Sequence, residues 1–325
     1  MEFGSNNQQP LLSIAIPTWN RAEQLQVALR RLLPSISKFG RSIELIISDN
    51  GSEDNTQEII AETLLSYDEI NLNSFKHEVN TGFFGNFKKC ISLGTGKYFW
   101  LLSDDDFLFE GVIETIMEIL SSKADDVGAI FLDDWTNDES DVEKHSYNIV
   151  NKEDFFKIGG YRHTLISSVI YAHNVQGNDD IFDALQSNSL IGYPIFLKSV
   201  ANYDSFGIIK GNALLKTNDE EVRFDALGIF TVELAECLKI GYEVLPTKIM
   251  DFIANQFLAT LIFTHYKDFK YKGRYNNERN QSYGIFKYYL KYKNFWKYIF
   301  PVILLDNHAY DNFNKFVRKN ITKSF

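Results

Sequence analysis

The chain contains three consecutive carboxylates, Asp104, Asp105 and Asp106, whose type and spacing suggest metal binding more directly than any other residues do. Adjacent negative charges repel one another, so a folded chain that gathers them needs something to offset their charge. A hard divalent cation, Mg²⁺ or Mn²⁺, does so with one or two protein carboxylates plus phosphate oxygens and water. The alternative is a solvated acidic turn, the usual fate of a charge run. The apolar residues on both sides, 99–102 and 107–109, favour the metal site.

The segments around this triplet predict an α/β sheet. Apolar runs alternate with segments of helical periodicity, which predicts strands at 12–16, 43–48, 73–78, 97–102 and 127–132 and helices at 25–33, 54–65, 83–93 and 111–120. This order implies a mostly parallel sheet with helices on both faces. Polar clusters at 17–21, 49–52 and 103–106 each follow a strand, so we expect them to converge beyond the carboxyl ends of the strands.

Composition narrows the class of protein. The chain has 325 residues, 45% of them hydrophobic, enough for a sizeable core. Cys90 and Cys237 lie in apolar stretches without metal-ligand spacing, which is typical of buried thiols in a cytosolic protein. The net charge of −10 argues against nucleic-acid binding. The longest apolar run near the end, 298–305, is too short to span a bilayer.

Four sequence motifs occur in a fixed order through the first third of the chain. They are Ser-Ile-Ala-Ile-Pro-Thr-Trp-Asn-Arg at 13–21, Ile-Ile-Ser-Asp-Asn-Gly-Ser-Glu-Asp-Asn-Thr at 46–56, Asn80-Thr81-Gly82 with Asn86, and Trp-Leu-Leu-Ser-Asp-Asp-Asp at 100–106. Together they resemble the signatures of glycosyltransferase family 2, and the last resembles its D-x-D metal motif. Their wording is nearest to the abequosyltransferase-like branch, which adds sugars to bacterial surface polysaccharides. The resemblance covers about residues 11–125 and is faint beyond them.

The resemblance implies a GT-A fold: a Rossmann-like, mostly parallel sheet flanked by helices, here followed by a helical, aromatic-rich, basic extension. It implies a metal-dependent, inverting hexosyl- or deoxyhexosyltransferase that moves a sugar from a nucleotide diphosphate donor to a glycan or lipid-linked glycan. On this reading residues 1–10 are a cloning remnant and disordered lead, 11–125 bind the nucleotide sugar, 126–260 bind the acceptor within the same domain, and 261–325 form the tail.

Residue by residue, the resemblance assigns the metal to Asp104, Asp105 and Asp106, with the first two also reaching the ribose. The remaining nucleotide-sugar contacts it implies are Pro17, Thr18, Asn20, Arg21, Asp49, Asn50, Asn80, Gly82 and Asn86. Many family members carry an acid where this chain has Asn50, so the base stays open among uracil, thymine and cytosine. Residues 49–52 also suit a turn that caps the following helix, and both roles can hold at once.

Inversion at the anomeric carbon needs a general base to take the acceptor's proton. The family's acid pair before a late helix reads Ile229-Phe230 here, and the nearest acid at the helix entrance is Asp225. We nominate Asp225 as the base, with capping of the helix expected over 226–240 as its alternative role. The fallback candidates are Asp179, Asp180, Asp219, Glu220 and Glu233.

Residues 265–325 carry thirteen Lys and Arg against four acids, and 283–300 reads as a basic amphipathic helix rich in aromatic residues. This composition suits anionic lipid headgroups, which would place a cytoplasmic enzyme peripherally on the cytoplasmic face of the inner membrane. A homo-oligomer contact, or packing on the acidic body, is the open alternative. Two rival functions remain. One is a non-catalytic carbohydrate-binding or scaffold protein, which the missing acid pair keeps open, and the other is a sugar nucleotidylyltransferase. The nucleotidylyltransferase is disfavoured because residues 17–20 occupy the place of its Gly-rich loop.

Overall fold

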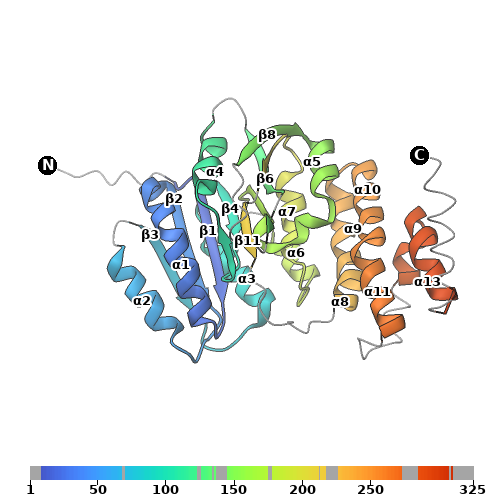
Figure 1. Cartoon of the computed structure of the whole chain (residues 1–325), viewed down its shortest axis with the longest axis horizontal. Coiled ribbons are helices and arrows are strands. Elements are labelled where there is room, and N and C mark those ends of the chain that lie inside the picture. The colour runs from blue at the N-terminus through green and yellow to red at the C-terminus, as the bar shows by residue number, and fades with distance from the viewer. Residues whose placement is uncertain are drawn as a thin grey trace. The chain divides into compact units, whose positions relative to one another are not determined.

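The computed structural model describes residues 9–67, 70–122, 126–133, 135–136, 145–174, 178–211, 213–216, 226–272, 285–306 and 309. The chain forms two compact units, residues 1–222 and residues 223–325. The first contains the sheets, and the described part of the second is helical (Figure 1).

An eight-stranded sheet in the order β3-β2-β1-β4-β9-β6-β10-β8 is the centre of the first unit. Its strands are β1 (Leu12–Thr18), β2 (Ile43–Asp49), β3 (Asn71–Lys76), β4 (Tyr98–Leu101), β6 (Val127–Leu132), β8 (Ser146–Asn151), β9 (Val169–Ala172) and β10 (Ser205–Lys210). Strands β8 and β9 run antiparallel to their neighbours, and the others share one direction. The chain therefore builds β1-β2-β3 outward and then returns to place β4 on the other side of β1. Such a reversal is the switch point at which α/β sheets bind their ligands, and here it lies beyond the carboxyl ends of β1 and β4.

Helices cover both faces of this sheet, as the sequence predicts (Figure 1). One face carries α1 (Ala22–Ile36), α2 (Thr56–Ser66) and α4 (Val112–Ser121). The other carries α3 (Gly82–Leu93), α5 (Lys152–Gly159) and α7 (Gly192–Val200). Shorter elements are η1 (Ser37–Ser42), η2 (Gly160–Thr164), η3 (Ile166–Ser168) and α6 (Asp179–Ala184), together with a second sheet of β5 (Asp106–Leu108), β7 (Trp135–Thr136) and β11 (Leu214–Lys216).

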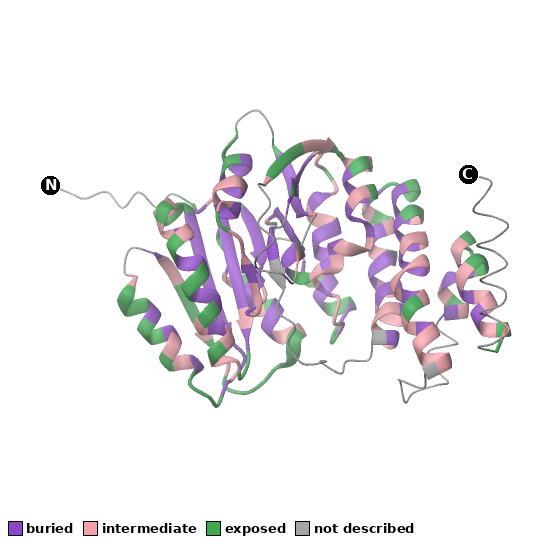
Figure 2. Cartoon of the chain, in the orientation of Figure 1, coloured by how far each residue is buried: buried purple, intermediate pink, exposed green. Residues whose placement is uncertain are grey.

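Burial of both sheet faces explains why the central strands are almost continuously apolar (Figure 2). Alternate side chains enter different cores: Ile14 and Trp100 face α1 and α4, whereas Phe99 faces the opposite layer. That opposite layer is aromatic, with Phe155 stacked on Phe206 at a ring-centroid distance of 4.5 Å. The two cores hold the strand ends in register at the polar edge of the sheet.

The second unit contains α8 (Ala226–Gly228), the π-turn η4 (Ile229–Glu233), α9 (Leu234–Val244), α10 (Thr247–Ala259), α11 (Leu261–Lys272), the π-turn η5 (Phe295–Ile299) and α13 (Phe300–Leu304). The helix expected over 226–240 instead continues to Val244. It stops before Pro246, because a residue that precedes a proline disfavours helical dihedrals. Among the described residues, no helix has both the length and the apolar character that a membrane span requires.

The prediction of one helix over 283–300 is wrong for the described residues 285–300. Helical residues 285–289 are followed by a turn at 290–292, before the chain becomes helical again. Tyr289, Tyr292 and Phe295 are buried, and the Tyr292 hydroxyl lies 2.9 Å from that of Tyr242. Three of the aromatic residues expected on an amphipathic face therefore lie in the core of this unit.

The predicted strands and helices up to residue 132 are confirmed, with boundaries that differ by a few residues. Sequence analysis did not anticipate β5, β8, β9, β10 or the helices between them. Strand β9 inserts antiparallel between β4 and β6, so the last predicted strand is not adjacent to β4. The partners of β9 lie about 40 to 70 residues earlier in the chain, and pairing over such a separation leaves no local sequence pattern.

Gly96 is a position where the fold has no room for a side chain. A Cβ atom there would lie 2.7 Å from the Ser13 backbone nitrogen and 2.9 Å from the Leu12 carbonyl carbon. We expect Gly96→Ala to lower the free energy of unfolding by about 1–3 kcal/mol, because backbone cannot move aside as a side chain can. The control is Gly192→Ala, whose Cβ would meet only Phe87 ring atoms at 3.4 Å. Urea unfolding measures both, and equal stabilities of the two variants would contradict this packing.

Candidate functional site

The ends of β1, β2 and β4 meet at one edge of the sheet, as the polar clusters predict. Thr18, the last residue of β1, donates its hydroxyl to the Asp104 carboxylate at 2.8 Å. The backbone nitrogen of Asn50, just after β2, donates to the Thr18 carbonyl at 2.9 Å. Residues 18, 50 and 104 are thus linked by direct hydrogen bonds although up to 86 residues separate them in sequence.

Arg21 joins the first cluster to the carboxylate triplet. Its Nε lies 3.0 Å from Asp104 Oδ1 and its Nη2 lies 2.7 Å from Asp105 Oδ2. One guanidinium therefore spans two neighbouring carboxylates, a charge-assisted arrangement with fixed geometry. Arg21 immediately precedes α1, so the helix start fixes the position of this cation.

Asp104 is only 4% exposed, and its side chain 6%. Burial raises its pKa to about 6, although the Arg21 charge and the Thr18 hydrogen bond act in the opposite direction. The neighbouring charge of Asp105 raises the pKa further. Arg21 therefore offsets the buried negative charge only in part, and an additional cation would be electrostatically favoured here.

The donor set fits a cation that also binds phosphate. Among the residues that the structure describes, no three His, Cys, Asp or Glu side chains converge closely enough to hold a metal alone. Mg²⁺ and Mn²⁺ sites commonly use one or two carboxylates and take their other ligands from phosphate and water. Asp104 and Asp105 follow β4, and the half-buried Asp106 opens β5. Oxygen donors from this turn suit such a shared site.

Asn50 organises the loop that precedes α3. Its Nδ2 donates to Asn80 Oδ1 at 2.9 Å and to the Gly82 carbonyl at 3.2 Å. Its Oδ1 accepts from the Thr81 backbone nitrogen and hydroxyl, both at 2.9 Å. An amide can both donate and accept, and a carboxylate in this place could not make the two donations.

Asp49 and Asn20 shape the turns beside Asn50. The buried Asp49 carboxylate accepts from the Ser52 backbone nitrogen at 2.8 Å and from Gln57 Nε2 at 2.6 Å. Asn20 has a positive φ of 52°, a conformation that asparagine tolerates better than most residues. Its backbone nitrogen donates to Ser52 Oγ at 2.8 Å, and its Oδ1 accepts from the Glu53 backbone nitrogen. These bonds tie the turn after β1 to the turn after β2.

Asn86 lies beneath the site and is 3% exposed. Its Oδ1 accepts from Ser48 Oγ at 2.6 Å and its Nδ2 donates to the Ser48 carbonyl at 3.1 Å. The side chain therefore joins α3 to β2. Of the other predicted contacts, Pro17 is half-buried in β1, whereas Asn80 and Gly82 are exposed at the start of α3.

The nominated base, Asp225, lies outside the described residues, as do the fallback acids Asp219 and Glu220. Asp179 and Asp180 are exposed at the start of α6. Glu233 belongs to the second compact unit. The assignment of a base therefore stays a prediction.

Two residues of the site were not singled out from the sequence. Ser103 donates its hydroxyl to Asp105, and its backbone nitrogen donates to Ser167 Oγ at 3.0 Å. Ser167 also accepts, through its carbonyl, from Trp100 Nε1 at 3.0 Å. The position of Ser103, directly before the triplet, could have indicated it. Ser167 is 64 residues away, and nothing in the local sequence marks it.

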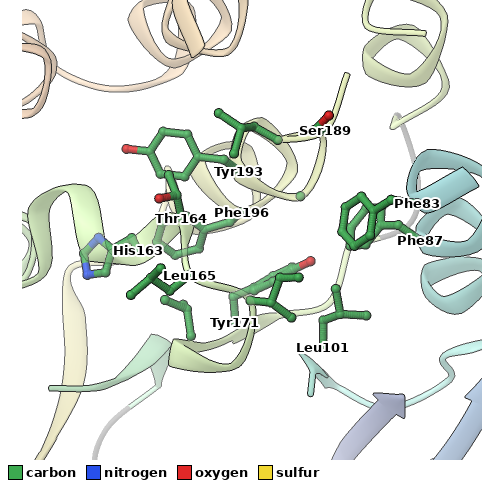
Figure 3. Close-up of a pocket in the computed structure, with 14 residues that line it drawn as sticks. Phe83, Phe87, Leu101, His163, Thr164, Leu165, Tyr171, Ser189, Tyr193 and Phe196 are labelled. Carbon is green, nitrogen blue, oxygen red and sulfur yellow. The ribbon is translucent and has the colours of Figure 1, made fainter. Parts of the chain in front are cut away.

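A pocket of about 60 Å³ lies on the α3 side of the sheet, where β4 ends (Figure 3). Its apolar wall includes Phe83, Phe87, Leu101, Leu165, Ile166 and Phe196. Ile166, which lines the pocket, is followed by Ser167, whose hydroxyl accepts from the Ser103 backbone nitrogen directly before the carboxylates. The pocket therefore lies next to the turn that holds them.

Comparison with known proteins identifies the family to which the chain belongs. A profile described as glycosyl transferase family 2 matches residues 13–185, more than half of the chain, and spans the whole carboxylate site. The chain belongs to glycosyl transferase family 2. This confirms the resemblance carried by the four sequence motifs.

Two curated proteins are similar to this chain over about a third of its length. Abequosyltransferase RfbV of Salmonella typhimurium is 37% identical over 118 residues, 35% of this chain and 34% of that protein. A Campylobacter jejuni GalNAc(5)-diNAcBac-PP-undecaprenol beta-1,3-glucosyltransferase is 31% identical over 111 residues, 34% of each chain. These alignments span about a third of each relative.

Solved structures show the same fold over a longer stretch. TarS of S. aureus in complex with UDP superposes with a TM-score of 0.55 at 16% identity, covering 84% of this chain and 74% of that one. A mannosyltransferase from Pyrobaculum calidifontis in complex with GDP-Man and Mn²⁺ has a TM-score of 0.52 at 10% identity, covering 83% and 77%. The fold of this family 2 member is GT-A, as predicted.

The Asn50 network predicts an unusual cost for a nearly isosteric change. We expect Asn50→Asp to lower the free energy of unfolding by about 1–3 kcal/mol at neutral pH, because the carboxylate faces two acceptors at Asn80 and Gly82. The loss should shrink at acidic pH, where a protonated carboxyl can donate again. Urea unfolding at both pH values measures the effect. The control is the same change at the exposed Asn73 of β3, and equal stabilities at neutral pH would contradict the network.

Proposed function

We propose that this family 2 protein is a metal-dependent inverting transferase that moves a sugar from a nucleotide diphosphate to a glycan or lipid-linked glycan. The observation that carries the proposal is the convergence of Thr18 and Arg21 on the carboxylates of Asp104 and Asp105 at the switch point of the sheet. Switch points of this kind bind nucleotides in α/β sheets.

Departure of a sugar from a diphosphate develops negative charge on the leaving group. A divalent cation, Mn²⁺ or Mg²⁺, would supply Lewis-acid stabilisation of that charge when bound at residues 104–106. Thr18 and Arg21 hold the Asp104 carboxylate in one orientation before any ligand arrives. A donor set fixed in advance avoids reorganisation during the reaction. TarS with UDP and the mannosyltransferase with GDP-Man and Mn²⁺ support a nucleotide sugar and a divalent metal as ligands of this fold.

The proposed acceptor is inferred from the relatives of this chain. Two of them are an abequosyltransferase and a beta-1,3-glucosyltransferase named for an undecaprenol-linked glycan. We infer a role in bacterial surface polysaccharide assembly, such as O-antigen or capsule, with a hexosyl or deoxyhexosyl group transferred. Asp225 remains our proposed general base for the acceptor hydroxyl.

The two rival functions predict different outcomes in a turnover assay. A carbohydrate-binding scaffold on this fold would bind the nucleotide sugar without turnover. A sugar nucleotidylyltransferase would release pyrophosphate, whereas a transferase releases the nucleoside diphosphate. Measurement of both products from a panel of nucleotide sugars, with and without EDTA, separates the three functions.

Replacement of the carboxylates tests the metal proposal. We expect Asp104→Asn with Asp105→Asn to lower kcat/KM by about a hundredfold or more, because the leaving group loses its electrostatic stabilisation. Release of nucleoside diphosphate measures turnover, and electron paramagnetic resonance of free Mn²⁺ measures metal binding independently.

The matched control for this pair is Asp126→Asn. Asp126 precedes β6 at the amino ends of the parallel strands, and its exposed carboxylate pairs with Lys97 at 2.9 Å. It should retain wild-type turnover and Mn²⁺ binding. Full turnover in the double variant, or loss in both variants alike, would contradict the proposal.

The basic second unit offers a contact for lipid headgroups. Trp296 is 51% exposed, Leu290 is 44% exposed, and the Trp296 indole donates to the Leu290 carbonyl at 2.9 Å. Exposed lysines 291, 293 and 297 accompany them. Cations beside amphipathic aromatic residues favour anionic membrane surfaces. We therefore propose peripheral attachment to the cytoplasmic face of the membrane, with a homo-oligomer contact as the alternative use of this surface.

Vesicle pelleting tests the attachment. We expect Trp296→Ala with Leu290→Ala to reduce binding to phosphatidylglycerol vesicles several-fold, because the apolar anchor is lost while the charges remain. Leu65→Ala, an 85% exposed residue of α2, is the control and should bind as the wild type does. Equal pelleting of all three proteins would contradict a membrane role, and a change of oligomeric state in the double variant alone would favour the oligomer.

A further inference from the structure

The pocket beside the carboxylate turn contains an unsatisfied polar group. Tyr171 of β9 is 5% exposed, and its hydroxyl has no hydrogen-bond partner within the part of the chain that the structure describes. In Figure 3 the hydroxyl oxygen points toward Phe83, Phe87 and Leu101, the apolar wall of the pocket. Buried hydroxyls almost always have a partner, either protein or ordered water, so this one is available to hydrogen-bond a group that enters the pocket.

The Tyr171 ring is held firmly enough to position that hydroxyl. Its centroid lies 5.9 Å from that of Phe99 and 5.8 Å from that of Phe196, the second in an edge-on arrangement. Tyr171 pairs with Phe99 across β4 and β9, so the position of its backbone is fixed by the sheet. A rigid donor of this kind gives directional recognition with little loss of side-chain freedom.

The rest of the pocket constrains the chemistry of the ligand. Of the described residues that line it, none is Asp, Glu, Lys or Arg. Burial lowers the pKa of the lining residue His163 to about 3, so this imidazole is neutral at physiological pH. The pocket therefore suits an uncharged group, and a phosphate or carboxylate would find no counter-charge among these residues.

Size and polarity narrow the group further. A volume of about 60 Å³ holds a few water-sized groups, which suits a substituent of a sugar better than a ring with all its hydroxyls. A sugar hydroxyl could accept from the Tyr171 hydroxyl, but it brings no apolar group to fill the wall of the pocket. A methyl group of a deoxysugar would fit the wall but would leave the Tyr171 hydroxyl without a partner.

We propose that this pocket receives the acetamido group of a 2-acetamido sugar, with the Tyr171 hydroxyl donating to its carbonyl oxygen and the apolar wall enclosing its methyl group. The inference rests on the proposed function, because it defines the sugar class used at the same site. The acetamido sugar is either the one transferred or the one that accepts it.

Direct binding tests the pocket without any turnover. We expect saturation-transfer NMR of the full chain with N-acetylglucosamine to show the strongest saturation at the acetyl methyl protons. Tyr171→Phe should weaken binding about tenfold, the effect of one lost hydrogen bond in a buried site. The control is Tyr98→Phe, which removes a buried hydroxyl that donates to the Val127 carbonyl on the opposite face of the sheet. It should leave binding unchanged. Uniform saturation of the sugar, or equal binding by the two variants, would overturn the proposal.

Paired substrates then distinguish the two sources of the group. UDP-GlcNAc against UDP-glucose varies the donor, and N-acetylglucosaminyl against glucosyl acceptors varies the acceptor. We expect a preference of about tenfold or more for the acetamido sugar in one arm, reduced in Tyr171→Phe and retained in Tyr98→Phe. Turnover without preference in either arm overturns the pocket assignment. Absence of all turnover contradicts the proposed function instead, and the NMR result still decides the pocket.

Discussion

The buried carboxylate of Asp104 is the feature on which the rest of the site depends. It accepts from Thr18 at the end of β1 and pairs with Arg21 at the start of α1, so it joins the first strand to the fourth. A carboxylate whose side chain is 6% exposed is costly unless it is neutralised, and Arg21, which it shares with Asp105, offsets only part of its charge. The same electrostatics that hold the strand ends together therefore leave a place for a further cation.

The fold supplies this arrangement through its strand order. Because β4 pairs with β1 on the side opposite to β2 and β3, the carboxyl ends of β1, β2 and β4 meet at one edge of the sheet. Asn50 and Asn86 then fix α3 against β2, one through the loop before the helix and the other through Ser48. Strand β9 enters on the other side of β4 and brings Tyr171 and Ser167 to the same region. The carboxylate turn thus takes its partners Thr18 and Arg21 from the first half of this unit, and Ser167 and Tyr171 come from the second.

Much of this could be predicted from the sequence because local patterns encode it. The strands and helices up to residue 132 have clear periodicity, and the polar clusters at 17–21, 49–52 and 103–106 end successive strands. Their convergence follows from parallel topology alone. The contributions of Ser167 and Tyr171 could not be predicted, because they depend on an antiparallel strand whose partner lies about 70 residues earlier. The helix expected to end at residue 240 runs on through Gly241, because burial in a packed helix outweighs the low helix propensity of glycine.

The location of a bound metal tests the central claim most directly. Crystals grown with Mn²⁺ and the nucleoside diphosphate that most stabilises the protein would show the ion by its anomalous scattering. The account predicts one manganese peak at about 2.0–2.4 Å from carboxylate oxygens of residues 104–106, with the diphosphate bound to the same ion above the end of β1. A peak elsewhere, or a diphosphate bound at the opposite edge of the sheet with these carboxylates still paired only to Arg21, would contradict it.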